Sequence, residues 1–267
     1  IHAGTYAEQI VNSVPSGISA AQPTTLQAFS GDTVWLQPTS YPLAANFVIY
    51  VGGTGRTDHD IVFDGLRLDN VNGAAAITPS AQCMKIDAPD APTDFYPHGI
   101  IFKNGEVIKG SMGFVIAGSF NQIVNCDINN LILATNSVPV GTYGIYNQGS
   151  SNIIDGNRIY DYPSIGIHQY AQHTVQNNIM RNNYIHDFQI PHLAGSEGPA
   201  GIVMGTGTNN QAYNNLLVRT GYGIGSGNGA TNPVIVNNTV ALATFSYGSP
   251  GANTNFIGYG FSSPVSN

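Results

Sequence analysis

Hydrophobic and polar positions repeat along the chain in one short pattern. An aliphatic stretch closes on Asn or Gly, an aliphatic residue follows three positions later, and a second strand opens with Gly-Ile after a corner. Successive copies place at the closing position Asn104, Asn125, Gly156, Asn182, Asn214 and Asn237. The intervals between these copies are 21, 31, 26, 32 and 23 residues. A minimum interval with variable excess predicts a solenoid of stacked strand coils that takes insertions at its corners.

The aligned copies place their hydrophobic residues in two columns. The first strand contributes Val107, Ile128, Ile159, Ile185, Leu217 and Val240. The second strand contributes Phe114, Ile145, Ile167, Ile202 and Ile224. Because side chains alternate between the two faces of a strand, we expect both columns to form a continuous core. At the closing position we expect a ladder of asparagine side chains that hydrogen-bond along one corner.

Composition agrees with one domain over residues 1–267, since the repeat covers most of the chain without a linker. The segment 244–267 is uncharged and is expected to form an irregular tail or cap. Eight Lys and Arg residues and a net charge of −7 argue against nucleic acid as a partner. No run of eighteen apolar residues occurs, so we expect no membrane partner and an export signal already removed. We expect Cys83 and Cys126, two coils apart, to be free thiols.

The segments AGTYAEQI (3–10) and IVFDGLRLDN (61–70), followed by the Asn and Gly-Ile coils, resemble secreted right-handed parallel β-helix proteins of the pectate-lyase-like superfamily. The resemblance implies an all-β fold, a right-handed parallel β-helix of about 7–9 coils, and a secreted or cell-surface location. Its members include polysaccharide lyases, glycoside hydrolases and proteins without known catalysis. The N-terminal cap of such proteins is not found here, so we expect an incomplete piece or an end covered by another subunit.

Loop lengths predict a cleft. The segments 131–143 and 188–200 are long, whereas the corner 162–164 between them is short. Two tall loops around a low coil would make a cleft with the Gly156 coil as its floor. The residues expected at this cleft are Tyr146, Arg158, Tyr160, Asp161, His168, His186, Asp187, His192 and Glu197.

The resemblance to lyases implies roles for these residues in cleaving an extended acidic polysaccharide by β-elimination. His168 or His186 would act as base, Tyr146 or Tyr160 as acid, and Arg158 would meet the substrate carboxylate. We expect Tyr184, Asn129 and His192 to bind substrate. Asp161, Asp187 and Glu197 would hold a cation, for which calcium is the candidate. Alternatively, Arg219 would neutralise Asp187, and a column of Arg67, Glu106, Asp127, Arg158 and Tyr184 would be a ladder of ion pairs.

Other interpretations remain open at this stage. A glycoside hydrolase would use Asp161 with Asp187 or Glu197 as its carboxylate pair. A non-catalytic extracellular subunit would stack end to end into filaments, which the low charge and the uncapped start would favour. As a zinc set, His168, His186 and His192 lack the close spacing of common sites. The loop carrying Arg56, Asp58, His59 and Asp60 has groups that hold cations, but a solvated turn is the favoured interpretation. The likeness of Pro97-His98 to an element of the alginate epimerases carries little weight.

Overall fold

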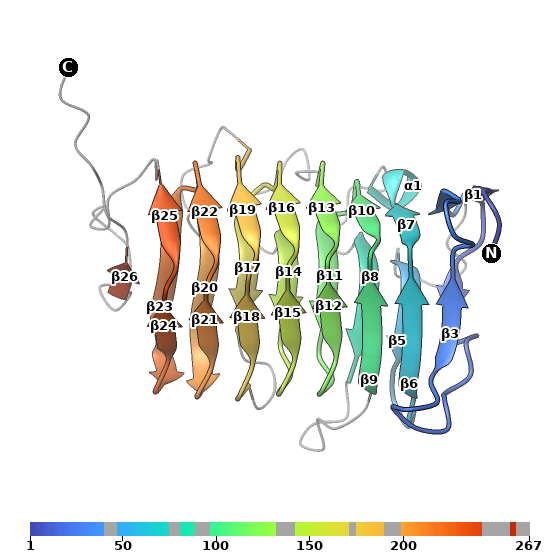
Figure 1. Ribbon diagram of the computed structural model, residues 1–267, viewed down its shortest axis with the longest axis horizontal. Helices are drawn as coiled ribbons and strands as arrows, with labels where there is room; N and C mark the ends of the chain where they lie inside the picture. Colours follow the sequence, from blue (N-terminus) through green and yellow to red (C-terminus); the bar gives the residue numbers. More distant parts are fainter. Residues whose placement is uncertain are drawn as a thin grey trace.

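The computed structural model describes residues 1–39, 47–74, 81–88, 97–131, 142–170, 175–189, 199–241 and 257–259. These residues form a parallel β-helix, in which the chain winds through three sheets and each turn stacks on the previous one (Figure 1). We name the sheets A, B and C in the order in which the chain meets them. Two of them contain nine strands and one contains eight.

Sheet A consists of β1 (Gly4–Tyr6), β4 (Val34–Leu36), β7 (Leu66–Asp69), β10 (Glu106–Ile108), β13 (Asp127–Asn129), β16 (Arg158–Tyr160), β19 (Tyr184–His186), β22 (Leu216–Val218) and β25 (Thr239–Ala241). Sheet B consists of β2 (Ile10–Val11), β5 (Phe47–Gly52), β8 (Gln82–Asp87), β11 (Met112–Ile116), β14 (Tyr143–Asn147), β17 (Ile165–Gln169), β20 (Ala200–Thr208), β23 (Tyr222–Thr231) and β26 (Ile257–Tyr259). Sheet C consists of β3 (Thr24–Gln27), β6 (His59–Asp64), β9 (His98–Lys103), β12 (Gln122–Val124), β15 (Ile153–Asp155), β18 (Ile179–Arg181), β21 (Gln211–Tyr213) and β24 (Val234–Val236).

All neighbouring strands pair in parallel except β26, which runs antiparallel to β23 at the C-terminal end. One helix, α1 (Val71–Ala74), follows β7 among the described residues. No helix in the described ranges is long and apolar enough to cross a membrane. Each coil contains three strands, one in each sheet. The sequence pattern presents the strands of sheets C and A as one strand, and the structure divides this stretch at the closing position.

The core consists of the two columns expected from the sequence. Val107 pairs in register with Ile128, and the column continues through Ile159, Ile185 and Leu217. The second column runs through sheet B in the same way, and all its members are fully or almost fully buried. Side-chain alternation thus supplies a continuous apolar interior from coils that could not bury their hydrophobic face alone.

Single residues in the left-handed conformation turn the chain at the corners. At the corner from sheet C to sheet A these residues are those of the closing position, with φ between 53° and 56° for the five Asn residues and 68° for Gly156. Asn and Gly adopt this conformation at the lowest cost, which explains why the closing position is occupied by these two residue types. The corner from sheet A to sheet B also has a left-handed residue in five successive coils, namely Lys109, Asn130, Asp161, Asp187 and Arg219.

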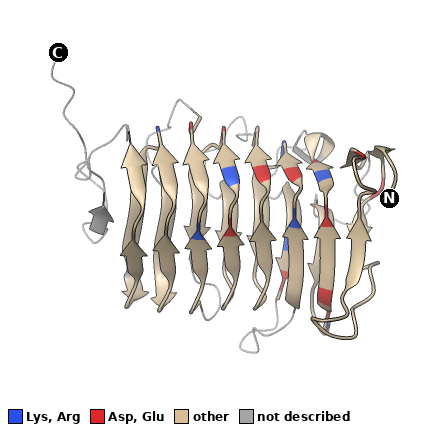
Figure 2. Cartoon of the chain, in the orientation of Figure 1, with Lys and Arg blue, Asp and Glu red and all other residues tan. Residues whose placement is uncertain are grey.

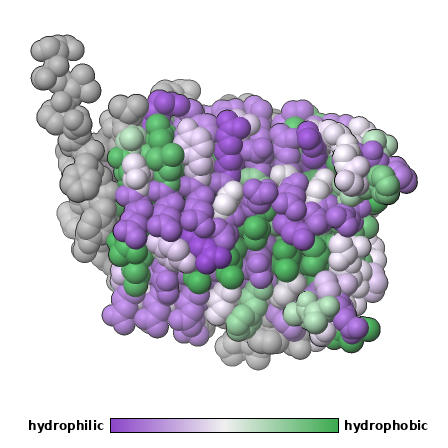
Figure 3. All heavy atoms as spheres, in the orientation of Figure 1, coloured by the Kyte–Doolittle hydropathy of each residue, from purple (hydrophilic) through white to green (hydrophobic). Residues whose placement is uncertain are grey.

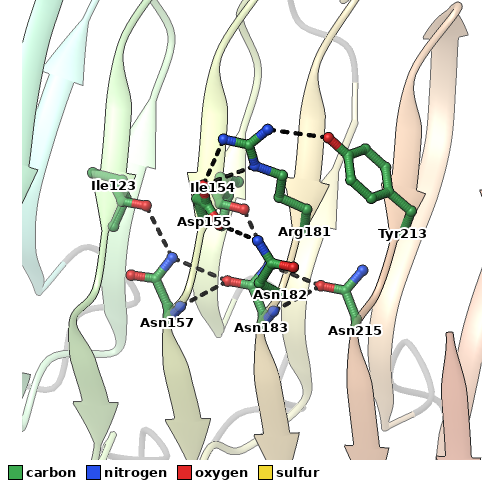
Figure 4. A network of polar contacts seen from close by, with 9 residues as sticks. All are labelled: Ile123, Ile154, Asp155, Asn157, Arg181, Asn182, Asn183, Tyr213 and Asn215. Atoms are coloured by element: carbon green, nitrogen blue, oxygen red, sulfur yellow. Dashed lines mark hydrogen bonds and ion pairs between the residues drawn. The ribbon is translucent and has the colours of Figure 1, made fainter. Parts of the chain in front are cut away.

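The asparagine ladder at the C-to-A corner lies one residue later than expected. Oδ1 of Asn183 accepts a hydrogen bond from the backbone N–H of Asn157 at 3.0 Å, and its Nδ2 donates to the carbonyl of Ile154 at 3.1 Å (Figure 4). Asn157, Asn183 and Asn215 repeat this pattern and are buried. The closing residues instead face solvent, where Asn125 donates to Asn104 at 2.9 Å. The first Asn of each pair therefore turns the backbone, and the second bonds the coils together.

A second ladder, which the sequence pattern did not reveal, lies at the corner from sheet B to sheet C. It consists of Asn121, Asn152, Asn178 and Asn210, and the Oδ1 of each accepts a hydrogen bond from a backbone N–H of the preceding coil. Buried backbone groups that leave a sheet at a corner need such partners, because water does not reach them. The two ladders thus satisfy the backbone at two of the three corners.

Both cysteines are buried free thiols, as expected. Cys126 occupies the ladder position of its coil in place of Asn, and its backbone N–H donates to Oδ1 of Asn157 at 3.0 Å. Burial raises the pKa of the Cys126 thiol to about 12, so the group stays protonated. The outer face of sheets A and C is mostly hydrophilic, with apolar side chains at separate points (Figure 3).

Candidate functional site

A row of outward-facing side chains crosses sheet A at one register position. Paired strands align Trp35, Arg67, Glu106, Asp127, Arg158 and Tyr184. Figure 2 shows the charges of β7, β10, β13 and β16 side by side in this row. We call these six residues the charged row. The row confirms the register expected from the sequence, and it adds Trp35, whose ring lies 5.5 Å from the guanidinium carbon of Arg67.

Ion pairs hold the middle of the charged row. Arg67 donates to Glu106 at 3.1 Å, and Arg158 lies 4.0 Å from Asp127. Arg158 and Asp127 remain half exposed, with 51% and 47% of their side-chain surfaces accessible. The four charged residues line a groove of about 310 Å³ together with Asn104, Gly105, Asn125, Cys126 and Gly156. The expected ladder of ion pairs is therefore present, and a groove follows it.

Next to this groove, at the Arg158 end, sheet A carries a histidine between two tyrosine rings. The His186 ring stacks on Tyr160 at 5.0 Å and on Tyr184 at 4.2 Å between centroids. Nδ1 of His186 lies 2.7 Å from Oδ2 of Asp187. Nε of Arg158 donates a hydrogen bond to Nε2 of His186 at 3.3 Å. Arg219 binds Asp187 with two nitrogens, one of them at 2.8 Å. We call these six residues, Arg158, Tyr160, Tyr184, His186, Asp187 and Arg219, the imidazole cluster.

These contacts define the protonation of the imidazole cluster. The hydrogen bond from Arg219, reinforced by the contact with His186, holds the pKa of Asp187 well below its usual range. An ionised Asp187 accepts the Nδ1 proton of His186, which leaves Nε2 as the hydrogen-bond acceptor that faces Arg158. Desolvation raises the pKa of Tyr160, so its hydroxyl stays protonated. The cluster therefore presents an imidazole with both nitrogens in hydrogen-bond contact, beside a phenol and a guanidinium.

The residues expected at one cleft lie on two different sheets. Arg158, Tyr160 and His186 belong to sheet A, with Tyr184. Tyr146 and His168 pair in sheet B, where their rings stack at 5.3 Å. Tyr143 also contacts His168, at 4.6 Å between centroids, and only 4% of His168 is exposed. Each imidazole thus lies beside aromatic rings, and these contacts do not bring the two histidines into one cluster.

The remaining candidates have the following positions. Asn129 is buried in β13 and donates to Glu106 at 3.2 Å. Asp161 and Asp187 occupy the same corner position of adjacent coils, joined by a backbone hydrogen bond of 2.8 Å. Arg219 neutralises Asp187, as the simpler of the two interpretations had it. His192, Glu197 and most of the two long loops lie outside the described residues, so the cation site and the cleft walls remain predictions.

Two features of the site escaped the sequence pattern. The register neighbours Glu106 and Asp127 were visible in the outward column, but the groove beside them depends on the shape of the corner and has no signal in the sequence. The contact of Arg158 with His186 joins two register positions diagonally, whereas column reasoning aligns only residues directly opposite one another. A diagonal search over neighbouring strands would have found it.

Comparison with known proteins identifies the fold. A family model described as right handed beta helix region matches residues 96–258. A solved 1,3-α-1,4-β-D-galactose-4-sulfate-3,6-anhydro-D-galactose-2-sulfate 4-galactohydrolase is similar in structure, with a TM-score of 0.56 and 14% identity over 85% of this chain and 51% of its own. The enzymatically active domain of tailspike protein 2 from bacteriophage CBA120 has a TM-score of 0.45 and 12% identity over 82% of this chain and 38% of its own.

The chain thus spans about half the length of the solved galactohydrolase. No curated protein matches the sequence significantly. The family match covers well over half of the chain and includes most of the coils that carry the charged row and the imidazole cluster. Together with the three parallel sheets, it establishes the expected fold. The chain belongs to the family of right-handed β-helix proteins.

Proposed function

We propose that the protein binds an extended acidic polysaccharide along the charged row and cleaves it by β-elimination at the imidazole cluster. The observation that carries this proposal is the arrangement of His186, with Nδ1 on Asp187, Nε2 towards Arg158, and a tyrosine ring on either side. A secreted or cell-surface location is part of the proposal, since such polymers lie outside cells.

The charged row supports the binding step. Six register positions across paired strands extend over about 24 Å, because neighbouring strands lie about 4.8 Å apart. Trp35 and Tyr184 at its two ends offer aromatic faces on which sugar rings stack, and Arg67 and Arg158 between them offer cations for acidic groups. The name of the similar galactohydrolase includes sulfated sugars, which makes an anionic polymer a reasonable substrate class to test here.

The imidazole cluster has the groups that β-elimination from a uronate requires. Arg158 would leave His186 and bind the carboxylate of the substrate, which stabilises the charge that develops next to C5. Nε2 of His186 would then take the C5 proton. The electron pair of the C5–H bond forms the C4–C5 double bond, and the bond from C4 to the glycosidic oxygen breaks. The Tyr160 or Tyr184 hydroxyl would protonate that oxygen as it leaves. A calcium ion held by Asp161 and Glu197 is a further element of the proposal.

Hydrolysis is the second candidate, and a specific observation favours it. Glu106 and Asp127 are register neighbours that both line the groove, and neighbouring strands lie about 4.8 Å apart. Retaining glycosidases place their two carboxyl groups at such a separation. In this alternative one carboxylate would attack the anomeric carbon while the other protonates the leaving oxygen.

The decisive experiment separates the two reactions by product. Purified protein is incubated with alginate, pectate, hyaluronan and a sulfated galactan, with calcium or with chelator. New reducing ends and the ultraviolet absorbance of an unsaturated uronate are both measured. Elimination yields both signals on a uronate polymer, whereas hydrolysis yields reducing ends alone and is the only route for a galactan without uronate.

Variants assign the residues. We expect His186→Gln to lower the elimination rate about a hundredfold or more, and Glu106→Gln to leave the elimination chemistry in place. His2→Gln is the matched control, because His2 also contacts a carboxylate, that of Asp32 at 3.1 Å, but belongs to neither proposed site. Equal elimination rates in wild-type protein and His186→Gln would remove the proposed base. No cleavage of any polymer, with particles that grow as concentration rises, would favour a stacking structural subunit instead.

A further inference from the structure

At the N-terminal end of the second asparagine ladder, the same corner changes its chemistry. The corner from sheet B to sheet C has a left-handed residue in every one of six stacked coils, from Asn209, Asn177, Ser151 and Phe120 to Gly99 and Asp60. The residue after it is Asn in the four C-terminal coils of this series but Ile100 and Ile61 in the other two. In those two coils the residue before it is histidine, namely His98 and His59. The amide ladder thus ends where two imidazoles and a carboxylate begin.

These three side chains converge although they come from positions 39 residues apart in the sequence. His59 and His98 are register partners in β6 and β9, and their rings stack at 5.4 Å with an interplanar angle of 14°. Nδ1 of His59 lies 3.1 Å from Oδ2 of Asp60. One ligand atom from each of His59, Asp60 and His98 lies within 4.8 Å of the others. No other group of three histidine, cysteine or carboxylate side chains in the described ranges meets this condition.

The backbone explains how two consecutive residues reach the same point. Neighbouring side chains on a regular strand point to opposite faces. Asp60 has φ of 52°, which bends the strand and brings its carboxylate to the side of His59. The partner position in the next coil is Gly99, also left-handed, and a Cβ there would lie 2.6 Å from Oδ1 of Asp60. The glycine therefore leaves the space that the carboxylate occupies.

The nearby cation, Arg56, pairs with Asp58 and not with the carboxylate of Asp60. Asp58, two residues before, is bound by Arg56 through two hydrogen bonds of 2.6 Å, so its charge is already compensated. Asp60 is 8% exposed and is paired with His59. A carboxylate shielded from water beside two imidazoles favours a bound cation, because the cation would compensate charge where solvent does not.

We propose that His59, Asp60 and His98 form a binding site for a divalent transition metal, with zinc as its probe. Two imidazole nitrogens and one carboxylate oxygen match the ligand preference of zinc, whereas calcium and magnesium prefer oxygen alone. In a tetrahedral zinc site with bonds of about 2.0–2.1 Å, ligand atoms lie roughly 3.3 Å apart, close to the spacing of His59 and Asp60. Small rotations of the side chains close the remaining distance, and water takes the fourth position. The metal would clamp two coils together where the amide ladder does not reach.

The test uses the full chain, freed of metal by chelator and dialysed. We expect isothermal titration with zinc chloride to show one tight site, cobalt to give visible absorption bands of a tetrahedral complex, and zinc to raise the melting temperature. His59→Gln and His98→Gln should each weaken zinc binding at least about tenfold and abolish the cobalt bands. Asp60→Asn tests the carboxylate with little risk to the fold, because Asn tolerates the left-handed backbone as well as Asp does.

The matched control is His2→Gln, which removes the histidine of another His–Asp contact of the same length that lacks a second imidazole. It should bind zinc as the wild type does. Wild-type zinc affinity in the folded double variant His59→Gln/His98→Gln, judged by circular dichroism, would overturn the proposal. So would an equal loss of affinity in His2→Gln. If the double variant fails to fold, the affinity of Asp60→Asn decides: binding equal to that of the wild type counts against the site, and a loss of tenfold or more supports it.

Discussion

At the residue scale, a column of glycines determines how closely the strands of sheet B pack against the aliphatic core side chains of sheet A. Gly113, Gly144, Gly166 and Gly201 open the second strands of successive coils, which is why Gly-Ile recurs in the sequence. A Cβ on Gly166 would lie 2.7 Å from Cγ2 of Ile185 and 2.7 Å from the carbonyl oxygen of Gly201. These glycines are therefore required for close packing and not for a special backbone conformation.

We expect Gly166→Ala to lower the free energy of unfolding by about 1–3 kcal/mol, since a methyl group without room forces backbone and core to shift. Gly156→Asn is the matched control, because a Cβ there meets only the backbone nitrogen of Asn125, at 3.9 Å, and Asn accepts its φ of 68°. Urea unfolding followed by circular dichroism measures both. Equal stability of Gly166→Ala and wild type would contradict the packing argument.

Asp187 links stability to pH. Its pKa is lowered in the folded state, chiefly by the hydrogen bond from Arg219, so its ionised form stabilises the fold. This contribution is present in full above the pKa of an unfolded Asp, about 4, and is lost as the pH falls from there through the lower folded pKa. Because both side chains are about half exposed, solvent screens the pair and the effect is small.

The measurement compares melting temperatures of wild type and Asp187→Asn as a function of pH. We expect the wild type to be slightly more stable at neutral pH and the difference to shrink below about pH 4. Asn also tolerates the left-handed backbone of this position, so the comparison isolates the charge. A difference that grows in acid would show that the ion pair does not stabilise the folded state.

At the element scale, the two asparagine ladders hold the coils together at their corners. Asn183 satisfies the N–H of Asn157 and the carbonyl of Ile154, both of which belong to the preceding coil. We expect Asn183→Ala to cost about 2 kcal/mol or more, because two buried backbone groups lose their partners. Asn182→Gly, next to it in sequence, removes only an exposed amide that donates to Asp155 and should change stability by about 0.5 kcal/mol or less.

Thermal unfolding of the two variants under one condition gives this comparison directly. The result to look for is a clear separation in melting temperature between them. If both variants melt at the same temperature as the wild type, the ladder contributes no measurable stability, and the coils are held by their sheets and core alone.

The sequence was sufficient for the elements that repeat and insufficient for those that do not. Core columns and outward columns follow from a register that the coils share, as with Val107, Ile128 and Ile159. The ladder was assigned one residue too early because Asn-Asn pairs do not reveal which member turns the backbone. The convergence of His59 and His98 was missed because long excursions separate them in the sequence.

At the scale of the whole molecule, the strands that the structure describes pair only with strands of adjacent coils. Stability in such proteins is close to a sum over units and interfaces. Removing residues 152–177 would join Ser151 to Asn178, so that Asn178 takes the ladder position of Asn152 and Ile202 stacks on Ile145. We expect this shortened chain to fold with a β-sheet circular dichroism spectrum and to stay discrete in size-exclusion chromatography.

A deletion one residue shorter, 152–176, is the matched control. It shifts the following strand by one position, and a shift of one residue exchanges the inner and outer faces of a strand. We expect this second chain not to fold. If the deletion of residues 152–177 fails to fold, the coils are not the interchangeable units that their pairing suggests.

Under the proposed function, the number of coils sets the length of polymer that the charged row contacts. Every added or lost coil changes the row by one strand spacing, about 4.8 Å, while its direction stays the same. Relatives with more coils would grip longer stretches of chain without any new kind of contact. The length of polymer in contact with the protein would then increase in steps of one strand of sheet A.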